Sequence, residues 1–336
     1  MTKYNLILIF LFFLSIISSA QTKLKFNIET GLHFDLNDSS NSAPNSVYRI
    51  AGMLKYKNKN KNSLSQISIK VRPEILNQNI GSLKINPKGT FFYFTKDIIW
   101  KSLLSIQHNS YYLFSKNSYY NTFTFINGAE FNKLKQFPLI LSIGYSYQNI
   151  DFNKTINSDF LFINIETTNH FNNYFYWNYG IFIQNFTTKT ELRNRNLKIN
   201  STGWMYGPQI KLHYLKKIII DAEYKFLLEN SNFISYPSYE HQIKLLAGFM
   251  LNKKFTFFLL ADLYIRRIKL KNTPEDTNPI LYSPTKNENQ LYLKTAYSIS
   301  RNTSLYFKTG YFSENLFLNN FNVEGINIFL GFEYKN

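Results

Sequence analysis

Residues 326–334 read INIFLGFEY, and every second residue of this stretch is large and apolar. The apolar members are Ile326, Ile328, Leu330, Phe332 and Tyr334, and the residues between them are mixed, small or charged. Successive side chains of a β-strand point to opposite faces, so this spacing predicts a strand with one apolar face. We expect it to be the closing strand of a cylinder whose outer surface faces lipid.

The same two-residue period runs through most of the chain. It is clearest in residues 24–34, 48–56, 67–72, 204–214 and 218–226, and a helical period fits none of these stretches. The spacers alternate between short ones (57–62, 132–136, 215–217, 252–254 and 300–302) and expected long loops (36–46, 77–88, 188–202, 231–239, 272–287 and 314–322). This pattern predicts an all-β, single, closed, antiparallel up-and-down transmembrane barrel of about 16 strands, with 12 or 14 left open.

The N-terminal residues have the features of a secretory signal. Lys3 is followed by an apolar run over residues 6–17 and by the small residues Ser18 and Ala20. A run of a dozen apolar residues is shorter than the roughly 20 that a spanning helix needs. We therefore expect a cleaved signal peptide over residues 1–20, and a barrel over residues 21–336 with no plug domain.

The composition limits the classes of partner. The chain has a net charge of +17, no cysteine, 25 Tyr and 32 Phe. The absence of cysteine excludes disulfides and metal–thiolate sites. A positive charge suits anionic partners, and for an exported chain we expect membrane lipid rather than nucleic acid. Tyr and Trp near many strand ends suit the head-group level of a membrane, which favours a lipid-facing barrel over a soluble β-sandwich.

The stretch GINIFLGFEY resembles the C-terminal signal by which outer-membrane proteins are recognised during barrel assembly. The leader ending at Ala20 and the composition rich in Asn, Lys and Ile resemble outer-membrane proteins of Bacteroidota. The chain departs from the usual signal because Lys335 and Asn336 follow Tyr334. The resemblance implies a location in the bacterial outer membrane, contact with its lipid, and the barrel-assembly machinery as a partner during biogenesis.

The alternation predicts which charged side chains line the space inside the barrel, the lumen. These are Lys25, Glu29, Arg49, Lys55, Lys70, Arg72, Lys211, Asp221, Glu223, Lys225, Lys244, Asp262, Arg266, Lys294, Lys308 and Glu333. Their excess of cations is consistent with a water-filled lumen that favours anions. The alternative is a solvated or mutually paired interior that selects nothing.

One pair of residues has the spacing of a hydrolytic site. His108 and Ser110 lie two positions apart and would share one face of a strand, as the pair does in outer-membrane acyl hydrolases, with Asn121 or Glu130 as an orienting group. Those enzymes, however, have Asn after the serine, and here Tyr111 follows. The sequence on balance predicts no enzyme activity and no cofactor.

The oxygen-rich residues 35–41 could suit calcium, but their spacing matches no known ion loop, and we expect a plain polar loop without metal. Three functions stay open. The first is a porin-like channel for small solutes with a mild anion preference. The second is a structural or assembly subunit of an envelope or secretion complex, with a lumen filled by side chains such as Phe258, Tyr264 and Phe329 and with other envelope proteins as partners. The third, the acyl hydrolase, depends on His108 and Ser110.

Overall fold

The computed structural model describes residues 22–36, 44–77, 80–113, 116–131, 138–151, 154–192, 197–232, 234–270, 288–316 and 321–336. These residues form sixteen strands. The strands are β1 (Thr22–Asp35), β2 (Asn45–Lys59), β3 (Ser63–Asn77), β4 (Ile80–Phe94), β5 (Ile98–Leu113), β6 (Lys116–Phe131), β7 (Leu139–Asp151), β8 (Lys154–His170), β9 (Phe175–Leu192), β10 (Leu197–Leu215), β11 (Ile218–Ser231), β12 (Ile234–Met250), β13 (Phe255–Leu270), β14 (Glu288–Ser298), β15 (Thr303–Leu316) and β16 (Phe321–Lys335). Within these residues, no helix has the length and apolar character needed to cross a membrane.

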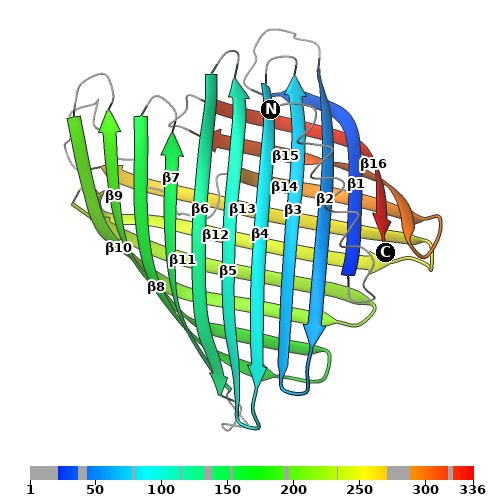
Figure 1. The fold of residues 1–336 in the computed structure, drawn as a ribbon, viewed down its shortest axis with the longest axis horizontal. Coiled ribbons are helices and arrows are strands. Elements are labelled where there is room, and N and C mark those ends of the chain that lie inside the picture. The colour runs from blue at the N-terminus through cyan, green and yellow to red at the C-terminus, as the bar shows by residue number, and fades with distance from the viewer. Residues whose placement is uncertain are drawn as a thin grey trace.

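The strands form one closed barrel in which each strand pairs with its neighbours in sequence, always antiparallel (Figure 1). The first and last strands close it: Gly31 of β1 lies opposite Phe329 of β16, and Phe26 lies opposite Tyr334. Closure pairs the two edges that an open sheet would leave with free backbone N–H and C=O groups. The predicted fold class is confirmed, with sixteen strands, and the chain's last alternating stretch is the closing strand.

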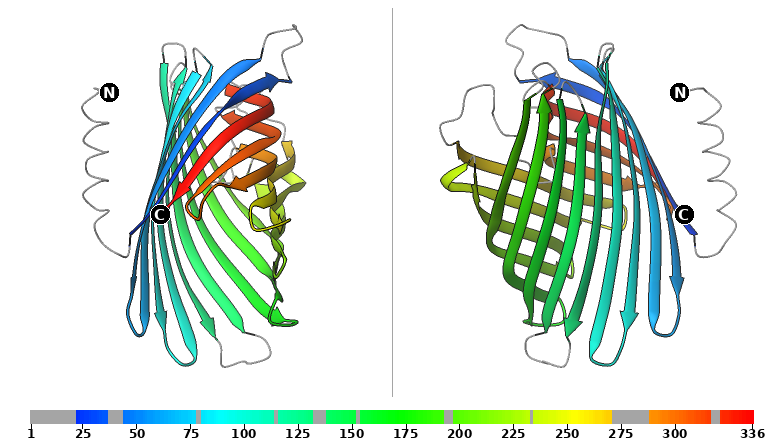
Figure 2. Two further views of the ribbon diagram at one scale, coloured as in Figure 1. Left: turned by 90° about the vertical axis from the view of Figure 1, so that its right-hand side faces the viewer. Right: turned by 60° about the vertical axis from the view of Figure 1, so that its left-hand side comes forward.

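The strands are strongly tilted, as closure of a barrel requires. In Figure 1, β2 to β8 run steeply down the near wall, while β12 to β16 cross behind them at a large angle. Figure 2 shows the same crossing from two other sides. The lumen therefore lies between two walls whose strands run in different directions.

The two rims of the barrel differ. One rim, here called the terminal rim, carries the first residue of β1, the last residue of β16 and every turn from an even-numbered to an odd-numbered strand. Several of these turns are tight and closed by backbone hydrogen bonds, such as Asn60 N–H to the Ser63 carbonyl at 2.9 Å and Lys216 N–H to the Ile218 carbonyl at 3.1 Å. The other rim, here called the opposite rim, carries the remaining connections.

Four of the six expected long loops are wrong. Residues 77–88, 188–202, 231–239 and 314–322 are mostly strand, because β4, β9, β10, β12, β15 and β16 continue toward the opposite rim. The Asn, Ser and Thr that suggested loops are paired in the ladder, for example Thr188 opposite Ser201. A polar strand segment is stable where both of its faces meet water or polar groups, so polarity alone did not mark a loop.

Candidate functional site

The outer face of the barrel is apolar. Large hydrophobic side chains on alternate positions are 40% or more exposed, among them Leu330 (63%), Leu293 (59%), Ile181 (53%) and Ile163 (43%). They belong to strands all around the barrel, so together they form an exposed apolar surface. An apolar surface that surrounds a closed barrel is typical of contact with lipid acyl chains.

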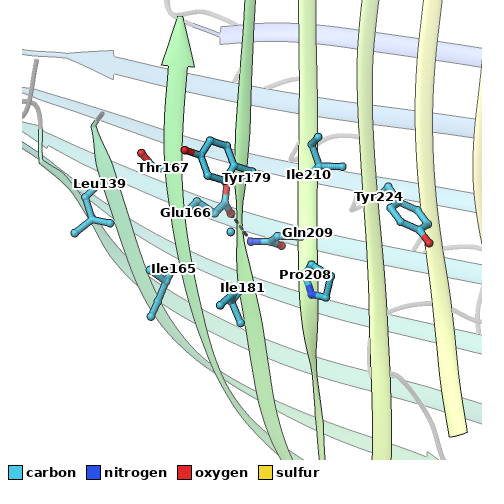
Figure 3. Close-up of a pocket in the computed structure, with 11 residues that line it drawn as sticks. Leu139, Ile165, Glu166, Thr167, Tyr179, Ile181, Pro208, Gln209, Ile210 and Tyr224 are labelled. Carbon is cyan, nitrogen blue, oxygen red and sulfur yellow. Dashed lines mark hydrogen bonds between the residues drawn. The ribbon is translucent and has the colours of Figure 1, made fainter. Parts of the chain in front are cut away.

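A shallow hollow of about 590 Å³ interrupts this outer surface over β7 to β11 (Figure 3). Its walls are outward side chains, mainly Leu139, Ile165, Tyr179, Ile181, Pro208, Ile210 and Tyr224. Pro208 leaves room there because its outward ring is short. Glu166 and Gln209 lie beneath the hollow and bond to each other at 3.0 Å, so the polar pair belongs to the inner face.

The sixteen charged residues that the sequence predicts for the lumen all lie at inward positions of their strands. Their positions alternate with the exposed apolar ones, as Glu29 (5% exposed) does with Ile28 (41%) and Lys308 (8%) with Phe307 (43%). They are not evenly spread. Most of these side chains belong to groups in which one carboxylate contacts several cations.

The first group, here called the closure cluster, joins β15, β16, β1, β2, β3 and β4. Glu29 accepts hydrogen bonds from Lys308 Nζ at 2.6 Å, Tyr306 Oη at 2.8 Å and Arg49 Nη1 at 3.2 Å. Glu74 contacts Arg49 as well, together with Arg72 at 3.1 Å and Lys84 at 3.4 Å. Because Glu29 and Lys308 lie 279 positions apart in sequence, this cluster forms only when the barrel closes.

The closure cluster also has aromatic members. Phe329 is fully buried, with the Arg49 guanidinium 4.9 Å and the Lys308 Nζ 4.6 Å from its ring centroid. Tyr306 carries Lys294 Nζ at 3.8 Å from its ring centroid. Cations over aromatic faces are stabilised by the ring quadrupole, which helps to hold positive charge in a partly desolvated interior.

Four further carboxylates on the inner face also contact cations. Glu333 contacts Lys335 at 2.6 Å, Lys25 at 3.1 Å and Lys294 at 3.3 Å. On β10 to β12, Glu223 contacts Lys225 at 3.2 Å and Lys244 at 3.5 Å. Glu166 bonds to Lys211 and Asn164, and Glu240 bonds to Arg266. Cations outnumber carboxylates in most of these groups, so the inner face keeps a positive bias after pairing.

Exposure of the inward side chains changes along the strands. Near the terminal rim the side chains of Asp221 (57%), Lys244 (41%) and Lys25 (37%) are open to solvent. Toward the opposite rim Tyr111 (1%), Glu229 (3%), Ser238 (0%) and others are covered by protein. The lumen is therefore open from the terminal rim and narrowed toward the opposite rim.

Part of this narrowing is apolar. Phe160, Phe186, Met205 and Leu227, on four adjacent strands from β8 to β11, form a buried cluster with Phe182 packed against it. These side chains occupy inward positions, so this part of the interior is dry. Alternation could not predict this cluster, because it gives the direction of a side chain and not the width of the space into which the side chain points.

The bulky inward residues named from the sequence have different surroundings. Phe329 is fully buried in the closure cluster, whereas Phe258 and Tyr264 are half-buried on β13. The apolar residues of the expected assembly signal lie on the outer face of β16, where Leu330, Ile326 (42%) and Phe332 (37%) are exposed. Their side chains are thus available to a lipid phase or to another protein.

His108 and Ser110 point outward, on the same face as Ile106 and Tyr112, which are both 43% exposed. Ser110 Oγ lies 2.7 Å from His108 Nε2, and His108 Nδ1 lies 2.5 Å from Asn121 Oδ1. Asn121 is directly opposite His108 in the β5–β6 ladder. Glu130, the other orienting group considered, occupies an inward position of β6 and cannot take this role.

The sequence-based expectation of a polar first loop cannot be compared in full, because residues 37–41 lie outside the described residues, as do the leader residues 1–20. Among the residues that the structure does describe, no group of three or more His, Asp or Glu could hold a metal ion.

Several contributors to the inner face were not singled out from the sequence. Glu74, Tyr306, Glu166, Gln209 and Glu240 organise the clusters, and each occupies an inward position of an alternating stretch. The alternation through residues 74–90 and 160–170 would have placed Glu74 and Glu166 inward, and Gln209 lies in the alternating stretch 204–214. Their partners could not be found in this way, since those lie one or two strands away.

Comparison with known proteins identifies no family for this chain. No protein-family model matches the chain, and no curated protein matches it significantly. Among solved structures, similar folds include a bacterial polysaccharide outer membrane secretin (8% identity, 94% of this chain and 98% of that one, TM-score 0.39). They also include the toluene transporter TodX of P. putida (7%, 95% and 90%, 0.40) and OccAB3 of Acinetobacter baumannii (7%, 95% and 100%, 0.41). At these identities and TM-scores, no conclusion about this chain follows from the likeness.

Proposed function

We propose that this chain is an outer-membrane β-barrel that passes small solutes, with a preference for anions, through a lumen entered from the periplasm. The membrane location rests on the apolar outer face, which surrounds a barrel with no free sheet edge. We assign the terminal rim to the periplasm, since barrels of this class have their tight turns there. The leader over residues 1–20 supplies export in this proposal.

One observation carries the transport function: the inner face is lined with charge and is open to solvent at the terminal rim. Lys70, Lys88 and Lys101 are exposed at inward positions of the adjacent strands β3, β4 and β5, and further cations surround Glu223 and Glu333 elsewhere on the inner face. Fields are concentrated in a narrow aqueous passage with low-dielectric walls, so this bias raises the local concentration of anions. The narrowing toward the opposite rim restricts passage to small solutes.

Single-channel recording in planar bilayers tests this function. Under a salt gradient we expect a small, steady conductance whose reversal potential shows anion preference. In the variant Phe160→Ala/Phe186→Ala the conductance should rise severalfold, because two large side chains of the apolar narrowing are removed. The control Phe123→Ala/Phe125→Ala removes two phenylalanines from the outer face and should leave conductance unchanged.

The result that contradicts transport is an absence of current from both the native barrel and the Phe160→Ala/Phe186→Ala variant, with both folded. The specific observation in favour of the second function, a structural or assembly subunit with a filled lumen, is the burial of inward side chains toward the opposite rim. In that outcome, envelope proteins that co-purify with the native barrel would support the scaffold function.

A further inference from the structure

Ser110, His108 and Asn121 form a chain of hydrogen bonds on the outer face of the barrel. Ser110 Oγ is 2.7 Å from His108 Nε2, and His108 Nδ1 is 2.5 Å from Asn121 Oδ1. Two features of the sheet bring them together. His108 and Ser110 share a face because they are two positions apart on β5, and the β5–β6 register sets Asn121 beside His108. None of the three belongs to the inner-face clusters.

The bonding pattern suits one tautomer of the neutral imidazole. The carbonyl oxygen of Asn121 can only accept a hydrogen bond, so the proton of the neutral His108 ring lies on Nδ1. Nε2 then has a free lone pair and accepts the Ser110 hydroxyl. A serine is activated when its hydroxyl is hydrogen-bonded to a base and a third group holds that base in the correct tautomer.

The surroundings of the three residues are those of a lipid boundary. Ile106 (43%) and Phe123 (38%) are exposed on the same face, on the side of the site away from the opposite rim. Toward that rim the outer face becomes polar: in the neighbouring hairpin Asn149 donates to Asn157 at 2.6 Å, and Tyr147 donates to Asn157 at 2.9 Å. The site thus lies where an apolar surface meets a polar one, the depth at which lipid ester groups are found.

We propose that Ser110, His108 and Asn121 form a catalytic site that hydrolyses carboxylic esters of membrane lipids. This activity is separate from solute passage, and it uses only the membrane location from the proposed function. Acyl chains would lie along Ile106 and Phe123, on the side of the site away from the opposite rim, and the ester carbonyl would reach Ser110. All three side chains are partly exposed, so a substrate has access from the lipid side.

The reaction proceeds in two balanced steps. Ser110 Oγ attacks the ester carbonyl carbon while His108 Nε2 takes its proton, and the proton passes to the departing alcohol oxygen as its bond to the carbonyl carbon breaks. An acyl-serine and a lysolipid remain. Water then attacks the acyl-serine, His108 takes a proton from the water and returns it to Ser110 Oγ, and the fatty acid leaves.

The alternative explanation is a polar pairing without chemistry, and the same two strands supply a matched control. Ser102 Oγ donates to Asn127 Oδ1 at 2.6 Å on the outer face of β5 and β6, directly opposite one another in the ladder. That pair has a serine and an asparagine but no imidazole. A variant at Ser102 therefore removes an equivalent hydroxyl from the same hairpin without touching a base.

The test uses the purified full-length barrel, folded in detergent micelles and in phospholipid vesicles. We expect a fluorophosphonate probe to add its mass to Ser110 in the native protein and in Ser102→Ala. We also expect hydrolysis of a p-nitrophenyl ester and release of fatty acid from the vesicles. Ser110→Ala should lose labelling at that site and at least about a thousandfold in kcat, because loss of a catalytic serine removes the covalent route.

Asn121 acts through His108 and is a positioning residue. Asn121→Ala should lower kcat by a smaller factor than Ser110→Ala and leave KM for the p-nitrophenyl ester unchanged, since no substrate contact is lost. Asn121→Asp should restore most of kcat, because a carboxylate oxygen also accepts from Nδ1. A merely structural role would change folding or KM in both variants alike.

Two outcomes would overturn the proposal. One is native protein that is folded by gel mobility but takes no label at Ser110 and hydrolyses neither substrate. The other is hydrolysis that Ser110→Ala retains at the native rate, which would assign the activity to a contaminant. Hydrolysis of the soluble ester without release of fatty acid from vesicles would retain the catalytic site and overturn the assignment of lipid as its substrate. Conductance is measured separately, so loss of one function does not imply loss of the other.

Discussion

Replacement of Glu29 by glutamine should strongly destabilise the barrel, although it changes only one oxygen to a nitrogen. Glu29 is 5% exposed and is the carboxylate that Lys308, Tyr306 and Arg49 share at the junction of β15, β16, β1 and β2. Glutamine keeps the volume and one acceptor oxygen. It removes the negative charge that offsets two cations whose side chains are 10% and 8% exposed.

The size of the expected loss in unfolding free energy depends on which counter-charges Arg49 and Lys308 keep after the substitution. Arg49 keeps Glu74, which it also contacts, whereas Lys308 loses the counter-charge 2.6 Å from its Nζ. Removing one partner of a buried ion pair costs about 3–5 kcal/mol, mainly because the other charge is left uncompensated. The matched control is Glu191→Gln. Its pair with Lys198, at 2.9 Å, has side chains that are 50% and 74% exposed, so the expected loss is below about 1 kcal/mol.

Equilibrium urea unfolding in detergent micelles, followed by the fluorescence of the three tryptophans, measures both variants. The free energy of unfolding should fall far more for Glu29→Gln than for Glu191→Gln, with equal denaturant dependence in the two. Mobility of unheated samples on gels checks that each variant reaches the folded state at the start. Equal, small losses of unfolding free energy in both variants would refute the reasoning, because they would show that the closure cluster is solvated like the exposed Glu191–Lys198 pair.

Three further predictions concern other parts of the chain. Gly331→Ala should lower the free energy of unfolding by about 1–3 kcal/mol in the same urea assay, because an added Cβ would lie 2.2 Å from the ring of Tyr306. The hydrogen bond from the Tyr306 hydroxyl to Glu29 holds this ring in place, so an unchanged stability would show that the ring moves freely. Ile163→Arg, on the outer face near the middle of β8, should cost about 2–4 kcal/mol in vesicles, and a negligible cost would argue against contact with lipid. N-terminal sequencing of the protein from outer membranes should begin at Gln21, and a sequence beginning at Met1 would contradict cleavage after Ala20.

The sequence by itself determined the strands and their faces. Alternation in stretches such as residues 24–34 and 326–334 reflects a local rule, since neighbouring side chains of a strand point to opposite sides whatever the strand packs against. A strand number of about sixteen, the antiparallel order and the closing role of the last strand followed from that rule and from the spacing of the turns, and the structure decided between sixteen and the open alternatives of 12 and 14. Local polarity misled only where long strands continue beyond the apolar surface, as in β9 and β10.

The tertiary structure decided which side chains meet. His108 and Ser110 could be paired from their spacing, but the contact between His108 and Asn121 depended on the register of β5 and β6, which sets them directly opposite each other. Glu29 and Lys308 come together only because the barrel closes. The dry cluster around Phe160 likewise depends on the width of the lumen. Facing is a property of each strand, whereas contact depends on register, tilt and closure, which involve residues far apart in the chain.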